Sequence, residues 1–145
     1  MVWEYFFYQY KDWDLETIRQ GIDELTDIGE AKEIVEVIVD IIDEPTGALL
    51  VKKALKAGVR FSKEDIIELL GSLDDKEIGM LVKNLHDEGV RFTRDEILEL
   101  YGFIENHLLS EIVIHSPSSF YEDDLAELEE YISYRAYQIL KEKRF

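Results

Sequence analysis

A block of fourteen residues occurs twice in the chain, and the second copy starts 31 residues after the first. The first copy, GVRFSKEDIIELLG, occupies residues 58–71, and the second, GVRFTRDEILELYG, occupies residues 89–102. Eight of the fourteen positions are identical. A fixed period in this range is typical of proteins built from stacked helical units. The repeat therefore predicts an all-α fold.

Each copy of the block carries signals for the start of a helix. Ser62 is a favourable N-cap residue, and Asp65 three positions later completes a capping box. Phe61 and Ile66 stand at the two positions of a hydrophobic staple, which fixes the angle at which the chain enters the helix. Gly58 is suited to end the preceding helix. The equivalent residues of the second copy predict a helix with the same start signals at Thr93.

About eight helices are expected from apolar periodicity and turn signals. The segment IVEVIVDII has strand-like composition, but its acidic residues recur at helical spacing and favour a buried helix. Pro45 to Gly47 is predicted to be a turn. Gly71 and Gly102 either end their helices or allow a neighbouring helix to approach closely. The main predicted helices are 14–28, 30–43, 48–57, 62–73, 93–104 and 120–143, with others around 78–85 and 108–113.

The repeat resembles HEAT-like α-helical repeats, in which short antiparallel pairs of helices stack into an array. The resemblance covers roughly residues 14–115 and implies an array with caps at both ends. We expect one domain over residues 1–145, with an aromatic N-terminal cap at 1–13 and an acidic C-terminal capping helix at 119–143. The period is shorter than the usual HEAT period, so the alternative is an irregular helical bundle. The resemblance implies no functional residues.

The formal net charge of −17 limits the classes of partner. Nucleic acid and anionic membranes would repel this chain, whereas a basic protein would be attracted to it. The chain has no cysteine, and no apolar run is long enough to span a membrane. We therefore expect a cytoplasmic protein without direct nucleic-acid or membrane binding. The alternative explanation of the acidity is solubility alone.

Acidic residues are concentrated toward the C-terminus. Residues 95–134 contain eleven Asp and Glu but no Lys or Arg. The six in the nine residues 122–130 are the predicted contacts for a basic partner: Glu122, Asp123, Asp124, Glu127, Glu129 and Glu130. The alternative is a solvated helix whose acidic start suits the helix dipole.

These features favour a non-enzymatic binding protein whose acidic surface engages a basic protein. In its small size, acidity and helical character the chain is similar to bacterial immunity proteins, which cover the basic active sites of nuclease toxins. The alternative is an adaptor or scaffold that binds through a concave face or through its aromatic N-terminus. A homodimer is compatible with either hypothesis.

A metal-dependent enzyme is the third hypothesis. His107, Glu111 and His115 stand at i, i+4 and i+8, and ligands at this spacing can share one side of a helix. However, the HExxH, GxSxG and phosphate-binding motifs are all missing from the sequence. His115 is predicted to be a partly buried packing residue instead. We therefore expect no catalytic residues, no metal and no cofactor.

Overall fold

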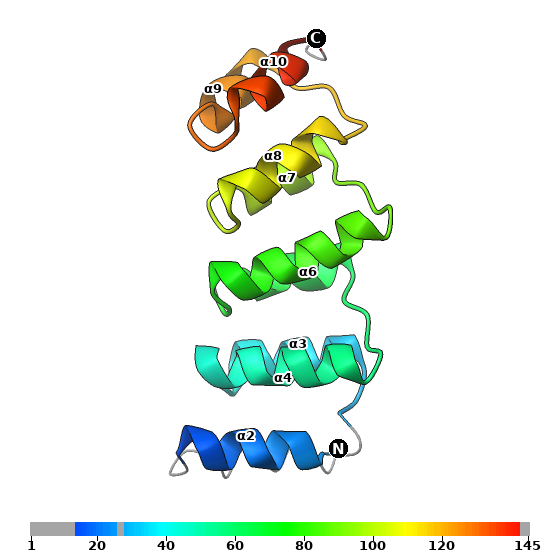
Figure 1. The fold of residues 1–145 in the computed structure, drawn as a ribbon, viewed down its shortest axis with the longest axis vertical. Coiled ribbons are helices and arrows are strands. Elements are labelled where there is room, and N and C mark those ends of the chain that lie inside the picture. Colours follow the sequence, from blue (N-terminus) through cyan, green and yellow to red (C-terminus); the bar gives the residue numbers. More distant parts are fainter. Residues whose placement is uncertain (1–13, 26–27, 143–145) are drawn as a thin grey trace. The chain divides into compact units, whose positions relative to one another are not determined.

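The computed structural model describes residues 14–25 and 28–142, and this part of the chain is all-helical. It contains nine α-helices and no strand, which confirms the predicted all-α fold. The aromatic N-terminal segment 1–13 lies outside the described residues. The contacts divide the chain into two compact units, Met1–Asp74 and Asp75–Phe145, called here the N-terminal and C-terminal units. Each unit is described by itself (Figure 1).

The N-terminal unit contains four described helices. Helix α4 packs against α2 and α3, and α3 also packs against α5. The buried side chains that join them are aliphatic, with Ile22, Ile34, Leu50 and Ile66 each no more than 1% exposed. The bounds of these helices are α2 (Leu15–Glu24), α3 (Ala31–Asp40), α4 (Glu44–Lys56) and α5 (Lys63–Leu69).

Most of the strand-like segment IVEVIVDII lies in helix α3, as the spacing of its acidic residues predicted, although the helix ends at Asp40, before the last two isoleucines. Its buried residues are Ile34, Val35, Val37 and Ile38, whereas Glu36 is exposed. The buried face of a helix can be rich in β-branched residues, because packing outweighs their weak intrinsic helix propensity.

The predicted turn at Pro45 to Gly47 is wrong, because these residues form the first turn of α4. The Asp43 side chain caps this helix by accepting a 3.0 Å hydrogen bond from the Thr46 amide. Proline is tolerated in a first helical turn, where its missing N–H would have no intrahelical partner. Gly47 permits close packing, because an added Cβ would lie 3.0 Å from the Leu73 side chain.

The two copies of the repeated block have the same helix-start structure. Ser62 Oγ accepts from the Asp65 amide at 3.1 Å, and the Asp65 carboxylate accepts from the Ser62 amide at 2.9 Å. Thr93 and Glu96 form the equivalent reciprocal pair in the second copy. Both predicted capping boxes are therefore present. The wider HEAT-like arrangement stays a prediction.

The helices of the block are shorter than predicted. Helix α5 ends at Leu69, and α7 spans Arg94–Leu100. Gly71 and Gly102 follow, each with φ of 85°, and an added Cβ would meet nothing within 4 Å at either position. Of the two alternatives for these glycines, the structure supports chain reversal after a helix rather than a close helix–helix approach.

The C-terminal unit contains five described helices. Helix α8 packs against α6, α7 and α10, and α9 packs against α10. The three helices α6, α8 and α10 therefore follow one another in space, and α7 and α9 accompany α8 and α10 (Figure 1). Their bounds are α6 (Asp75–Asp87), α7 (Arg94–Leu100), α8 (Asn106–Ile114), α9 (Glu122–Leu128) and α10 (Tyr134–Glu142).

The predicted continuous helix at 119–143 is also wrong, because the chain breaks between α9 and α10. Ser133 caps α10 by accepting a 3.1 Å hydrogen bond from the Ala136 amide. Its own amide donates to Ser110 Oγ of α8 at 2.8 Å. This bond from a distant residue holds the break, and the segment itself contains no glycine or proline that would have indicated it.

Candidate functional site

The predicted acidic contacts lie on α9 and the turn that follows it. Residues 122–130 are called here the acidic segment. Five of its six carboxylates belong to exposed residues, namely Glu122, Asp123, Glu127, Glu129 and Glu130. These side chains present negative charge to solvent from one short helix and its C-terminal turn.

Asp124 is different, because it is buried and only 4% exposed. Its carboxylate accepts hydrogen bonds from Arg94 Nε at 2.6 Å and Arg94 Nη2 at 2.9 Å. It also accepts from the Tyr121 amide at 2.8 Å. The hydrogen bonds from Arg94 lower the pKa of the Asp124 carboxyl, while its burial acts in the opposite direction. Asp124 therefore attaches α9 to α7, and its prediction as a partner contact is corrected.

The loop between α8 and α9 completes this attachment. Ser116 is buried, and its hydroxyl donates to the Phe92 carbonyl at 2.7 Å. Ser118 Oγ accepts from the Arg94 amide at 3.0 Å. Two serines that stand near His115 in the sequence are thus engaged with backbone groups. The serines of this loop therefore have a structural role, and the structure gives no reason to regard them as nucleophiles.

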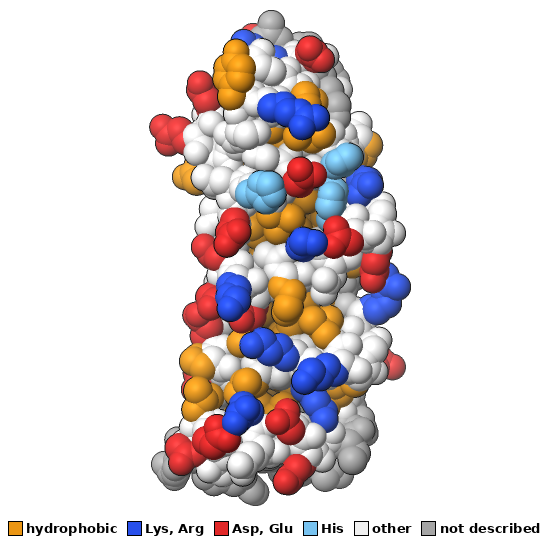
Figure 2. All heavy atoms as spheres, viewed as in Figure 1, with side chains coloured by type: hydrophobic (Ala, Val, Ile, Leu, Met, Phe, Trp, Pro, Cys, Tyr) orange, Lys and Arg blue, Asp and Glu red, His pale blue; other side chains and the backbone are white. Residues whose placement is uncertain are grey.

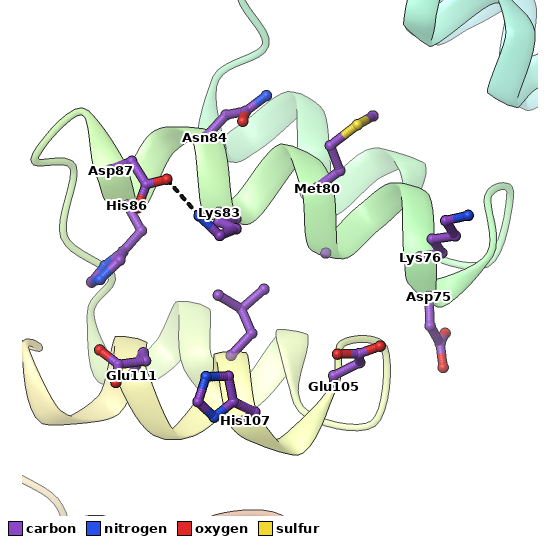
Figure 3. Close-up of a pocket in the computed structure, with 12 residues that line it drawn as sticks. Asp75, Lys76, Met80, Lys83, Asn84, His86, Asp87, Glu105, His107 and Glu111 are labelled. Atoms are coloured by element: carbon purple, nitrogen blue, oxygen red, sulfur yellow. Dashed lines mark hydrogen bonds and ion pairs between the residues drawn. The ribbon is translucent and has the colours of Figure 1, made fainter.

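A groove runs between α6 and α8, with a volume of about 540 Å³ (Figure 3). Its lining mixes acidic, basic and apolar groups, including Met80 and Leu108. Lys83 and Asp87 form an ion pair at 2.8 Å on the α6 side. A second groove of about 460 Å³ lies between α8 and α10, and His107 and Glu111 line both grooves. The two grooves along α8 have room for an extended segment or a helix of a partner.

Beside the first groove, three potential metal ligands come together. His86, Glu111 and His115 offer ligand atoms that all lie within 4.8 Å of one another. The rings of His86 and His115 have centroids 5.2 Å apart, and His115 Nε2 lies 3.9 Å from Glu111 Oε2. On the face shown in Figure 2, histidine side chains gather around an acidic side chain.

This cluster differs from the one considered in the sequence. The predicted trio paired Glu111 and His115 with His107, but the structure places His86 beside them instead. His86 belongs to the last turn of α6, whereas the other two lie at the end of α8. His115 is also more open than predicted, because its side chain is 47% exposed. The packing of α6 on α8 creates the cluster, and no spacing along the chain could have indicated His86.

His86 has a mixed electrostatic environment. Arg91 Nη1 lies 3.2 Å from its Nδ1 and donates to its carbonyl oxygen at 3.2 Å. Partial burial lowers the pKa of His86, and electrostatic interactions with Arg91 and His115 lower it further. Asp87 and Glu111 oppose this shift. The net effect of these groups is a pKa of His86 below its ordinary value.

No family model matches the chain, and neither a curated protein nor a solved structure is significantly similar to it. Among the described residues, no helix has the length and apolar character needed to cross a membrane. The geometry of the C-terminal unit gives the candidate surfaces, which are the acidic segment, the two grooves and the His86–Glu111–His115 cluster.

Proposed function

We propose that this chain is a non-enzymatic protein-binding module that engages a basic protein through its acidic segment. The observation that carries the proposal is that one of the six carboxylates is buried and anchored, whereas the other five are exposed. Asp124 is fixed by Arg94, and its five acidic neighbours are exposed. The segment therefore presents its charge from an anchored position, so a partner meets a defined pattern of carboxylates.

Two exposed tyrosines support a protein as the partner. Tyr121 precedes α9 and is 52% exposed, and Tyr134 begins α10 and is 79% exposed. Tyrosine is enriched in protein–protein interfaces because it contributes a large contact area and a hydroxyl. Here the two rings stand at either end of the acidic segment in sequence. Charge would accelerate the encounter, and the tyrosines would contribute contact area.

The proposed partner class is a basic protein whose own ligand is anionic. A carboxylate surface can occupy such a protein's phosphate-binding cleft, which is the way an immunity-type inhibitor of a nuclease would act. A cytoplasmic location is part of this proposal, since the chain has no cysteine and suits a reducing compartment. The proposal also includes a HEAT-like arrangement of the helix pairs.

Affinity capture from the source organism's lysate tests this proposal. The bait variant replaces the five exposed acids of the segment with glutamine or asparagine. The matched control neutralises five exposed acids of the N-terminal unit, namely Glu24, Glu36, Asp40, Glu64 and Glu68. We expect a basic protein that is retained at low salt by the wild type and the control, released at high salt, and lost with the segment variant. Retention of the same proteins by all three baits would refute the proposal.

The grooves of the C-terminal unit favour an adaptor as the second candidate function. Met80 and Leu108 line the groove between α6 and α8, so an apolar side chain of a partner can be buried there. A partner held in this way would resist high salt and would be lost with Met80→Glu. The proposed role of the aromatic segment at 1–13 concerns residues that lie outside the described part of the chain.

A further inference from the structure

We infer that His86, Glu111 and His115 form a binding site for a divalent transition-metal ion, with Zn²⁺ as the best match to the ligands. The site joins the last turn of α6 to the C-terminal end of α8. It is separate from the acidic segment, so the inference does not depend on the proposed function.

The distances between the ligand atoms are compatible with a metal after small side-chain movements. Zinc binds imidazole nitrogen at about 2.0–2.1 Å and carboxylate oxygen at about 2.0–2.2 Å, usually in tetrahedral geometry. Ligand atoms in such a site are therefore about 3.3–3.5 Å apart. Glu111 and His115 already approach to 3.9 Å, and all three ligand atoms lie within 4.8 Å. Because the Glu111 and His115 side chains are about half exposed, they can rotate to close this difference.

The types of ligand select the class of metal. Imidazole nitrogen suits zinc, copper, nickel and iron, whereas calcium and magnesium prefer sites made of oxygen atoms. Two histidines and one carboxylate are a known combination for zinc with three protein ligands, which leaves a fourth position for water. The site is open to solvent on the side of Glu111 and His115, so both the ion and this water have access.

The local charges mostly favour a cation. Glu111 supplies one negative charge, and the net charge of −17 raises the concentration of cations around the whole chain.

Arg91 is the group that opposes a cation at this site. Its guanidinium donates to the carbonyl oxygens of His86 and Val90 at 3.2 and 3.3 Å, in addition to its approach to His86 Nδ1. The two bonds to carbonyl oxygens do not involve the imidazole. The His86 ring can therefore turn toward Glu111 while Arg91 keeps these bonds. We expect the remaining positive charge to weaken metal binding, so Arg91→Ala should strengthen it.

The test is a titration of the untagged full-length protein with Zn²⁺, followed by calorimetry and by NMR of the histidine side chains. The chain contains three histidines, so His107 serves as an internal reference. We expect one equivalent of Zn²⁺ to bind and to shift the signals of His86 and His115, while those of His107 stay in place. The metal should also raise the thermal unfolding midpoint, because it binds only the folded arrangement.

Four variants identify the ligands. His86→Ala, His115→Ala and Glu111→Gln should each weaken binding at least about tenfold, because loss even of a residue that only supports a ligand commonly costs that much. His107→Ala lies on the same helix outside the cluster and should bind as the wild type does. Glu111 and His115 are exposed and His86 is partly buried, so circular dichroism will verify that each variant folds.

The outcomes separate a true site from general attraction to an acidic protein. Binding that survives His86→Ala and His115→Ala, or that shifts all three histidines equally, would overturn the inference. Absence of Zn²⁺ binding by the wild type would also overturn it. Loss of binding in the neutralised acidic segment with unchanged histidine signals would assign the ion to those carboxylates instead. None of these results would alter the capture experiment, because that experiment changes no residue of the cluster.

Discussion

Arg94, the first residue of α7, holds Asp124 of α9 through two hydrogen bonds of 2.6 and 2.9 Å. The same guanidinium lies 4.9 Å from the centre of the Tyr121 ring, at a distance suited to a cation–π contact. One arginine thus fixes the start of the acidic segment by its charge and by its planar face. The carboxylate that Arg94 binds, that of Asp124, is the only one of the segment that is buried.

The first prediction concerns the cost of removing this carboxylate. Asp124→Ala should lower the free energy of unfolding by about 2 kcal/mol, because it leaves the Tyr121 amide and the cation without their acceptor. The neighbouring exposed residue provides the control, since Asp123→Ala should change stability by less than about 0.5 kcal/mol. Urea unfolding of both variants provides the measurement. Equal effects of the two substitutions would show that Asp124 does not hold α9.

The second prediction is the pH dependence of this contribution. The pKa of Asp124 is lower in the folded protein than its ordinary value of 3.8, so the unfolded chain binds more protons at low pH. The stabilisation by Asp124 is therefore complete above pH 3.8 and is lost as pH falls through the lowered folded pKa. We expect the difference in urea midpoint between wild type and Asp124→Asn to shrink as pH falls below this value. A difference that stays constant or grows on acidification would contradict this assignment.

Local sequence rules predicted well those parts of the fold that local bonds determine. The capping boxes at Ser62 and Thr93 involve residues three positions apart, so the sequence alone indicates them. The helical state of IVEVIVDII followed from the spacing of its acids. The ends of the helices were less predictable. Gly71 and Gly102 were compatible with two roles, and only the backbone angles distinguish them.

Tertiary contacts determined the features that the sequence missed. The break before α10 depends on Ser110, which is 23 residues from its partner Ser133. Asp124 was assigned to the surface because nothing local indicates its bond to Arg94, 30 residues earlier. The metal-ligand cluster likewise needs His86 from one helix and Glu111 from another. Such pairings require knowledge of which helices are neighbours, and one sequence does not contain a direct signal for this.

The third prediction tests the break between α9 and α10. Ser110 is 7% exposed, and its hydroxyl donates to the Asn106 carbonyl at 2.9 Å while accepting from the Ser133 amide at 2.8 Å. Ser110→Ala should cost about 1–2 kcal/mol, because the Ser133 amide loses its acceptor in a partly buried position. Hydrogen exchange at this amide should accelerate more than exchange in α6. Unchanged protection of the Ser133 amide would mean that the turn does not depend on α8.

The fourth prediction compares a glycine that follows α6 with a glycine inside the same helix. Gly89 ends α6 with φ of 97°, and the following amide of Val90 donates to the Leu85 carbonyl at 3.0 Å. Gly89→Ala should therefore destabilise the protein by about 1–2 kcal/mol, because a side chain at positive φ is strained. Gly79 lies within α6, and an added Cβ would meet Leu108 at an ordinary distance of 3.7 Å. Gly79→Ala should stabilise the protein by about 0.5–1 kcal/mol, since alanine favours a helix and restricts the unfolded chain. Urea unfolding would give opposite signs for the two variants, and equal signs would refute the assigned end of α6.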